Sequence, residues 1–288
     1  ENPHLYLLRL VDAGGRTVAL QRFGFRTFTA DGEWLRLNGV KFKPRGHTFD
    51  SWIRRDIHLN ENQEMEKLLR YYKSIGINMV RPHSMNGVLP ETFFHLCDEI
   101  GLVVYLDWPG AEYGETYGQN ASEALRSMMP AHAACFLDLS SHASLCMWSF
   151  GNEHYEGHEG NAYNQIHDEM YAQLKALDRQ NRPLCTSTGR QTWEAMSAGY
   201  LKENTDVLDD HQYRGGSCGT WQDNVEHLRR YAEVALKTFG KPMPKIDCEY
   251  GVPGDNLRYR TVTFNKLWPA FQLDPATPGL ATPMAEPL

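Results

Sequence analysis

The 288-residue sequence lacks the features that mark several large classes of protein. No apolar run approaches the roughly 18 residues that a membrane span needs, and no basic segment followed by an apolar one marks a signal peptide. Basic residues are scattered and few, with 29 Lys and Arg against 36 Asp and Glu and a net charge of −7. We therefore expect a soluble chain that binds neither membranes nor nucleic acid. The sequence does not indicate its cellular compartment or its oligomeric state.

Several catalytic signatures are missing as well. There is no G-x-S-x-G elbow, no Walker loop and no G-x-G-x-x-G, so serine hydrolases and nucleotide or dinucleotide enzymes have no support. The six cysteines form no C-x-x-C pair, which favours reduced and mostly buried thiols. His154 and His158 bracket Glu156 without the H-E-x-x-H order, so we expect no metal and no cofactor.

A repeated alternation of strand-like and helix-like segments occupies most of the chain. Residues 38–268 predict successive βα units, and hence an α/β protein with a (β/α)₈ barrel. Residues 1–37 alternate apolar and polar between turn signals, which predicts the antiparallel tail of a β-sandwich. Residues 269–288 hold five prolines and predict an irregular tail. After Gly251 the sequence shows no clear pattern for an eighth βα unit, so we expect that unit to be either degenerate or incomplete.

Seven barrel strands and four helices can be assigned from the pattern. The predicted strands cover residues 40–45, 77–81, 102–106, 143–150, 183–188, 206–210 and 244–248. The predicted helices cover residues 61–75, 90–100, 162–180 and 221–239. Polar or ionisable residues end six of the seven strands, namely Arg45, Arg81, Asp107, Glu153, His211 and Glu249. Because barrel enzymes hold their chemistry at the C-terminal ends of the strands, these residues indicate a site.

Glu153 and Glu249 are the strongest candidates for catalysis. Each ends an apolar strand, and two carboxylates that face each other across a barrel mouth are what hydrolysis of a glycosidic bond requires. Asn152 suits a contact to a sugar hydroxyl, or else a helix cap. His211 and Tyr213 can orient and ionise Glu249, unless the histidine is structural.

The other strand-end residues have less specific roles. Arg45 and Arg81 either hold carboxylates structurally or lower a catalytic pKa, and His83 is a weaker candidate near the same strand. Asp107 and Trp108 stand together at the end of the third strand. The indole of Trp108 is a candidate for stacking on a sugar face.

Several passages resemble glycoside hydrolase family 2, the β-galactosidase, β-glucuronidase and β-mannosidase group. The most specific is His142-Ala143-Ser144 through Trp148-Ser149-Phe150-Gly151-Asn152-Glu153, which is similar to the family's acid/base signature. The others are Phe23-Gly24-Phe25-Arg26 with Leu37-Asn38-Gly39, Pro44-Arg45-Gly46, Leu96-Cys97-Asp98-Glu99-Ile100-Gly101-Leu102 and Cys248-Glu249-Tyr250-Gly251. The resemblance implies that residues 1–37 end an immunoglobulin-like domain and that residues 38–268 form the catalytic barrel.

By the same resemblance, Glu153 is the general acid/base, Asn152 contacts the 2-hydroxyl and Glu249 is the nucleophile. The leading hypothesis is therefore a retaining, exo-acting β-glycosidase with a carbohydrate substrate. Its two carboxylates should lie about 5 to 5.5 Å apart. A non-catalytic carbohydrate-binding or structural fragment is the alternative, and a metal-dependent hydrolase comes third. The sugar and the linkage are not legible.

Overall fold

The computed structural model describes residues 3–49, 62–83, 89–108, 121–154, 162–211 and 221–249. Its central sheet is parallel, with the strand order β10-β9-β8-β7-β6. These strands are β6 (Gly46–Phe49), β7 (Met79–Pro82), β8 (Val103–Asp107), β9 (Leu145–Ser149) and β10 (Leu184–Cys185). A second parallel pair consists of β11 (Leu208–Asp209) and β12 (Lys245–Ile246). The Thr48 hydroxyl donates to the carbonyl of Cys248 at 3.0 Å. The described strands therefore curve round most of a β/α barrel, as predicted.

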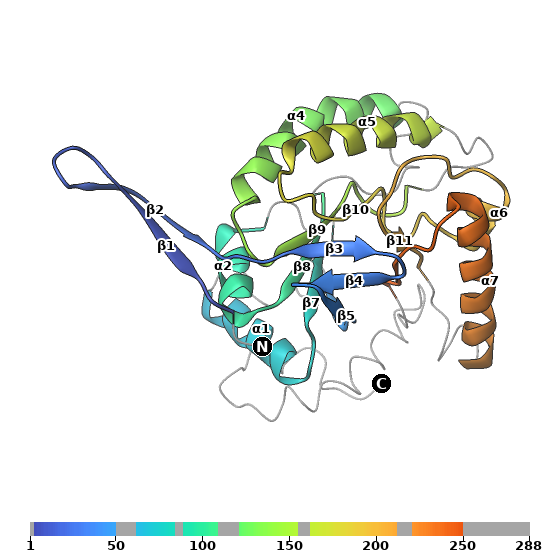
Figure 1. Ribbon diagram of the computed structural model, residues 1–288, viewed down its shortest axis with the longest axis horizontal. Helices are drawn as coiled ribbons and strands as arrows, with labels where there is room; N and C mark the ends of the chain where they lie inside the picture. Colours follow the sequence, from blue (N-terminus) through green and yellow to red (C-terminus); the bar gives the residue numbers. More distant parts are fainter. Residues whose placement is uncertain are drawn as a thin grey trace, which may run out of the picture.

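Helices follow the strands in turn and cover the outside of the barrel (Figure 1). They are α1 (Asn62–Ser74), α2 (Glu91–Ile100), α4 (Ala121–Leu139), α5 (Ala162–Leu177), α6 (Trp193–Ser197) and α7 (Trp221–Phe239). The structure confirms the four predicted helices to within a few residues. The sequence pattern missed α4, in which Pro130 lies within the helix, and α6, which has only five residues. The eighth unit and residues 269–288 lie outside the described residues.

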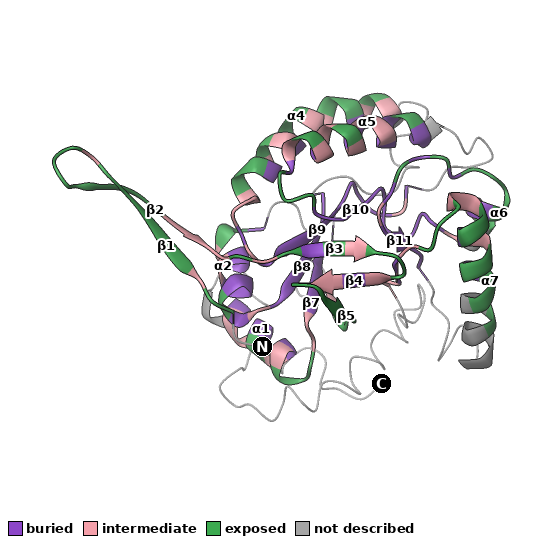
Figure 2. Ribbon diagram, in the orientation of Figure 1, coloured by how far each residue is buried: buried purple, intermediate pink, exposed green. Residues whose placement is uncertain are grey.

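The two faces of the parallel strands bury two separate apolar cores. Outward-facing Val80, Val104 and Trp148 pack beneath the helices. Inward-facing Met79 and Tyr105 belong to the core that fills the barrel. Figure 2 shows β7, β8 and β9 buried throughout. Because both faces of these three strands are covered, each reads as a largely apolar run, which is why the pattern located them.

The N-terminal strands form two small antiparallel sheets. One is the hairpin of β1 (Tyr6–Val11) and β2 (Thr17–Phe23), which projects from the body with most residues exposed (Figure 2). The other contains β3 (Phe28–Asp31), β4 (Trp34–Leu37) and β5 (Val40–Phe42). Phe28 and Leu35 of this sheet pack into the interior core of the barrel beside Met79 and Val103, the first residues of their strands. The sheet therefore closes the N-terminal end of the barrel.

The predicted first barrel strand, residues 40–45, is wrong. Val40–Phe42 forms β5, which pairs antiparallel with β4 across Asn38-Gly39. Both turn residues have positive φ, 52° and 79°, as a tight Asn-Gly hairpin requires. The first barrel strand is β6, so the antiparallel segment extends to residue 42. No described helix has the length and apolar character that crossing a bilayer would require.

Candidate active site

The site is built on side chains that point into the barrel and follow its apolar core. Alternate residues of a strand face the same side. On β7 the inward residue after Met79 is Arg81, and on β8 the residue after Val103 and Tyr105 is Asp107. The interior thus changes from apolar to charged at the C-terminal ends of the strands. Five of the six predicted strand-end residues meet there, because the barrel interior brings them together.

Arg81 is the hub of this polar layer. Its side chain is almost fully buried and donates from Nε to Asp107 at 2.9 Å and from Nη1 to Glu249 at 2.7 Å. Nη2 donates to Asn152 at 2.6 Å and to the hydroxyl of Thr188 at 2.8 Å. Burial alone would lower the pKa of Arg81, but Asp107 and Glu249 help to raise it well above its usual value. Arg81 is therefore a fixed positive charge that positions groups from four strand ends.

Glu249 follows β12 and lies against positive and donor groups. Oε1 accepts from Arg81 and lies 3.4 Å from His83 Nε2. Burial alone would raise the pKa of Glu249. The charge of His211, a hydrogen bond from His83 and the charge of Arg81 outweigh it, and hold the pKa well below its usual range. Glu249 is therefore ionised in neutral solution, as a nucleophilic carboxylate must be.

Glu153 sits on a strained turn after β9. Its φ is +51°, in the left-handed region that residues other than glycine rarely adopt. The Glu153 N–H donates to the carbonyl of Thr188 at 2.8 Å, and the Thr188 N–H donates to the carbonyl of Gly151 at 3.0 Å. These two hydrogen bonds to the segment after β10 stabilise the unusual backbone conformation of the turn. Strain that the surroundings maintain in this way is typical of functional sites.

His211 lies between the two glutamates. Its Nδ1 is 2.7 Å from Oε1 of Glu153 and 3.8 Å from Oε2 of Glu249. One ligating atom from each of the three residues lies within 4.8 Å of the others, so the two carboxylates face each other. Burial would lower the pKa of His211, but the charge of Glu249 and the hydrogen bond to Glu153 outweigh it and raise the pKa. The two acids thus favour the protonated form of the imidazole that lies between them.

The other side of His211 is enclosed as well. Its Nε2 lies 3.2 Å from the sulfur of Cys248. Gly189 approaches the ring so closely that a Cβ there would lie 2.5 Å from Nδ1, and its φ of +74° also favours glycine. Glu153, Cys248 and Gly189 therefore fix the orientation of the His211 ring.

Three further polar residues, which the sequence pattern did not distinguish, support the site. The hydroxyl of Thr188 donates to Asn152 at 2.9 Å. In the barrel interior, the Tyr105 hydroxyl donates to Asp209 at 2.9 Å. Burial raises the pKa of Asp209. Thr188 ends the predicted fifth strand, so its position was available as a signal. Tyr105 and Asp209 lie within strands, where nothing separates them from ordinary core.

Two predicted site residues lie elsewhere. Arg45 precedes β6, is exposed and donates from Nε to the carbonyl of Gly76 at 2.8 Å. It stands at the opposite end of the barrel because the first strand begins after it. The Trp108 ring is fully buried and packs against His132 and Trp148 with centroids 4.2 and 5.6 Å apart. It faces outward with the helix-side core, so it does not stack on a sugar. Tyr213 lies outside the described residues.

The donor set of this site does not favour a metal ion. Glu153, His211 and Glu249 form one cluster, and Asp209, His211 and Cys248 form another. In the first, the Arg81 guanidinium already lies 2.7 Å from Glu249 and would repel a cation. In the second, burial raises the pKa of Cys248 well above its usual value, so the sulfur is held as a thiol.

Residues 32–268 match the family model described as "Glycosyl hydrolases family 2, TIM barrel domain". A β-galactosidase from Pseudoalteromonas haloplanktis is 29% identical over 292 residues, which cover 97% of this chain and 25% of the relative. A β-galactosidase from Lactobacillus delbrueckii subsp. bulgaricus is 28% identical over 77% of this chain and 26% of its own length. The chain thus spans about a quarter of the length of these relatives.

Solved structures share the fold. A family 2 β-galacturonidase from Eisenbergiella tayi, bound to galacturonate, superposes with a TM-score of 0.64 at 21% identity. The match covers 95% of this chain and 49% of that one. A β-glucuronidase from Parabacteroides merdae gives a TM-score of 0.60 at 20% identity over 86% of this chain and 28% of that one.

Proposed function

The chain belongs to glycosyl hydrolases family 2, and on that premise we propose that its barrel is the catalytic part of a retaining, exo-acting β-glycosidase. Its substrate would be a carbohydrate with a terminal β-linked sugar. The β-galactosidase and β-glucuronidase names of its relatives support this class of substrate without selecting one sugar. Because the chain covers only part of those proteins, their activity comes to this chain only as part of the proposal.

The proposed reaction is a double displacement. The ionised carboxylate of Glu249 attacks the anomeric carbon, while Glu153 donates its proton to the leaving glycosidic oxygen. A covalent bond forms between Glu249 and the sugar as the bond to the aglycone breaks. Glu153, now a carboxylate, then takes a proton from water, and the resulting nucleophile displaces Glu249 and releases the sugar.

The facing arrangement of Glu153 and Glu249 carries this proposal. Carboxyl groups of retaining enzymes are only about 5 to 5.5 Å apart, whereas inverting enzymes leave room for a water at roughly 6.5 to 9.5 Å. A carboxylate oxygen of Glu153 lies within 4.8 Å of one of Glu249, which favours direct attack. The low pKa of Glu249 suits the nucleophile, since it must be unprotonated to attack.

Paired variants test the proposal. Glu249→Gly should abolish turnover of every aryl β-glycoside. Glu153→Gln should spare substrates with very acidic leaving groups, such as dinitrophenyl glycosides, because these need no proton from the enzyme. The chain and its variants should be assayed on galactosides, glucuronides and mannosides. Proton NMR of the first product should show the β-anomer.

Three outcomes would contradict the proposal. If neither Glu249→Gly nor Glu153→Gln changed turnover, neither glutamate would be catalytic. An α-anomer as first product would indicate inversion. Binding of a sugar by calorimetry, with no hydrolysis of any of these glycosides, would favour a carbohydrate-binding module instead. Thermal unfolding of each variant serves as the control for folding.

A further inference from the structure

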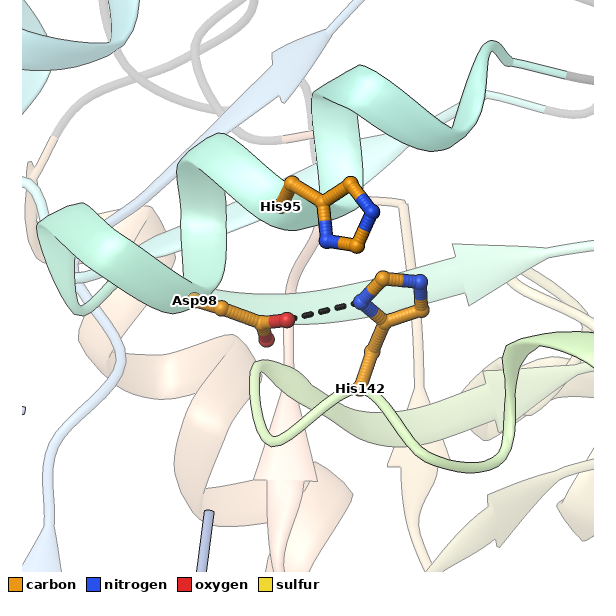
Figure 3. A group of neighbouring side chains, drawn as sticks. All are labelled: His95, Asp98 and His142. Carbon is orange, nitrogen blue, oxygen red and sulfur yellow. Dashed lines mark hydrogen bonds and ion pairs between the residues drawn. The ribbon is translucent and has the colours of Figure 1, made fainter. Parts of the chain in front are cut away.

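A third cluster of ligating side chains lies outside the active site. His95 and Asp98 come from α2, and His142 comes from the loop before β9 (Figure 3). One nitrogen or oxygen from each lies within 4.8 Å of the others. Two imidazoles and a carboxylate are the donors that Zn²⁺ and similar cations prefer.

Two of the three ligands are held rigidly. The His142 ring is buried and bonds from Nδ1 to Oδ2 of Asp98 at 2.7 Å. The other oxygen of Asp98 accepts the backbone N–H of Ser144, also at 2.7 Å. Asp98 and His142 are thus hydrogen-bonded to each other. By itself, this pair therefore indicates a structural role and not a ligand-binding site.

The hydrogen bonds of Asp98 and His142 do not account for the position of His95 beside them. It lies three residues before Asp98 on α2, so both side chains face the same side of the helix. The ring stands 4.9 Å from that of His142 and faces the pair (Figure 3). Its Nδ1 is buried and has no hydrogen-bond partner among the described residues. An imidazole nitrogen in that state is a free ligand.

A second carboxylate orients His95. Oε1 of Glu91 lies 3.4 Å from Nε2 of His95, one turn earlier on α2. A proton on Nε2 facing Glu91 leaves the lone pair on Nδ1, and metal-binding histidines are commonly oriented by an outer carboxylate in this way.

We propose that His95, Asp98 and His142 bind one divalent transition-metal ion of the Zn²⁺ type. The metal replaces the proton on Nδ1 of His142, and that proton moves to Nε2 of the same ring, which has no partner among the described residues. The side chain of His95 is 29% exposed, which provides the entry path and room for a water as fourth ligand.

The position of the cluster gives the ion a structural role. His142 precedes β9 and Glu153 follows it, so the ion and the candidate acid/base stand at opposite ends of one strand. The five residues of β9 alone span about 16 Å at the rise of a β-strand, which keeps the ion away from Glu153. The ion would cross-link α2 to a segment 44 residues further along the chain, and would stabilise the barrel without touching substrate.

Zinc titration of the whole chain tests the proposal. After treatment with EDTA and removal of the chelator, the protein should bind one Zn²⁺ in competition with a chromogenic chelator, and its Tm should rise with Zn²⁺ concentration. Co²⁺ in the same protein should give the visible absorption of a four-coordinate nitrogen and oxygen site. Absence of binding at micromolar Zn²⁺ would overturn the proposal.

Variants locate the ion. His95→Phe keeps a ring beside His142 but removes both nitrogens, so Zn²⁺ affinity should fall at least tenfold and the Co²⁺ absorption should vanish. Glu91→Gln should weaken binding by about tenfold, the usual effect of an outer partner. His4→Gln, an exposed histidine on the N-terminal segment, is the matched control and should change nothing. Binding that survives His95→Phe but is lost in His211→Gln would move the metal to the active site and overturn the proposal.

Discussion

His211 and Glu153 are joined by a hydrogen bond of 2.7 Å between Nδ1 and Oε1, although they lie 58 residues apart in the chain. The same nitrogen is 3.8 Å from Glu249. One imidazole thus contacts both candidate catalytic carboxylates. Because it is buried between them, its charge state influences both.

The first prediction concerns the pH dependence of activity. His211→Gln removes the charge that contributes most to the low pKa of Glu249, so that pKa should rise. The acidic limb of the pH profile of kcat/KM should then move to higher pH, and kcat should fall on the order of 100-fold. Hydrolysis of a nitrophenyl glycoside between pH 4 and 9 measures both. An unshifted acidic limb would remove His211 from this role.

The second prediction concerns the buried ion pair of Arg81 and Asp107. Arg81→Met leaves the carboxylate of Asp107 buried and unpaired, so the free energy of unfolding should fall by about 3 to 5 kcal/mol. Adding Asp107→Asn removes that unpaired charge. The double variant should therefore lose less stability than the sum of the two single variants, by about 1 kcal/mol or more in urea denaturation. Simple additivity would show that the two side chains do not interact.

The third prediction is the pH dependence of stability. The pKa of His211 is raised above 6.5 on folding, so its contribution is complete below pH 6.5 and is lost as the pH rises through the folded value. The lowered pKa of Glu249 has the opposite sign, and its contribution is lost as the pH falls below 4.5.

Urea denaturation at pH 5 to 9 isolates the contribution of His211, because that of Glu249 is constant above pH 4.5. The difference in unfolding free energy between the wild type and His211→Gln should be largest at pH 5 to 6 and should shrink as the pH rises. A difference that grows with pH would mean that His211 is buried in its neutral form.

The fourth prediction concerns Gly189. Gly189→Ala introduces a Cβ 2.5 Å from His211, so the ring must move away from Glu153 and kcat should fall at least tenfold. Gly199→Ala is the matched control, because its φ of +75° is nearly the same but no atom lies within 4 Å of the new Cβ. Both should lose about 1 to 2 kcal/mol to backbone strain, and only Gly189→Ala should lose activity. Equal kcat values in the two variants would contradict the tight packing of Gly189 on His211.

Much of the fold could be predicted from local pattern. Helices α1, α2 and α7 follow from their apolar spacing and from signals such as Gly101, whose left-handed conformation ends α2. The helix α4 could not be recognised, because Pro130 interrupts it. The error at β5 arose because a short apolar segment looks the same in a parallel and an antiparallel sheet. The Asn38-Gly39 turn carried the information that separates the two.

The sequence by itself determined most of the alternation of strands and helices and the residues that end most of the barrel strands, because both depend on neighbours a few positions apart. It also supplied the two glutamates as candidates. Only the tertiary structure decided that Arg81 contacts Asp107, Asn152 and Glu249, that His211 lies between the carboxylates, and that Arg45 and Trp108 lie apart from them. These relationships depend on which strand faces which across the barrel and on where each strand begins. A shift of one residue reverses the direction of every side chain in a strand, and a local pattern does not specify it.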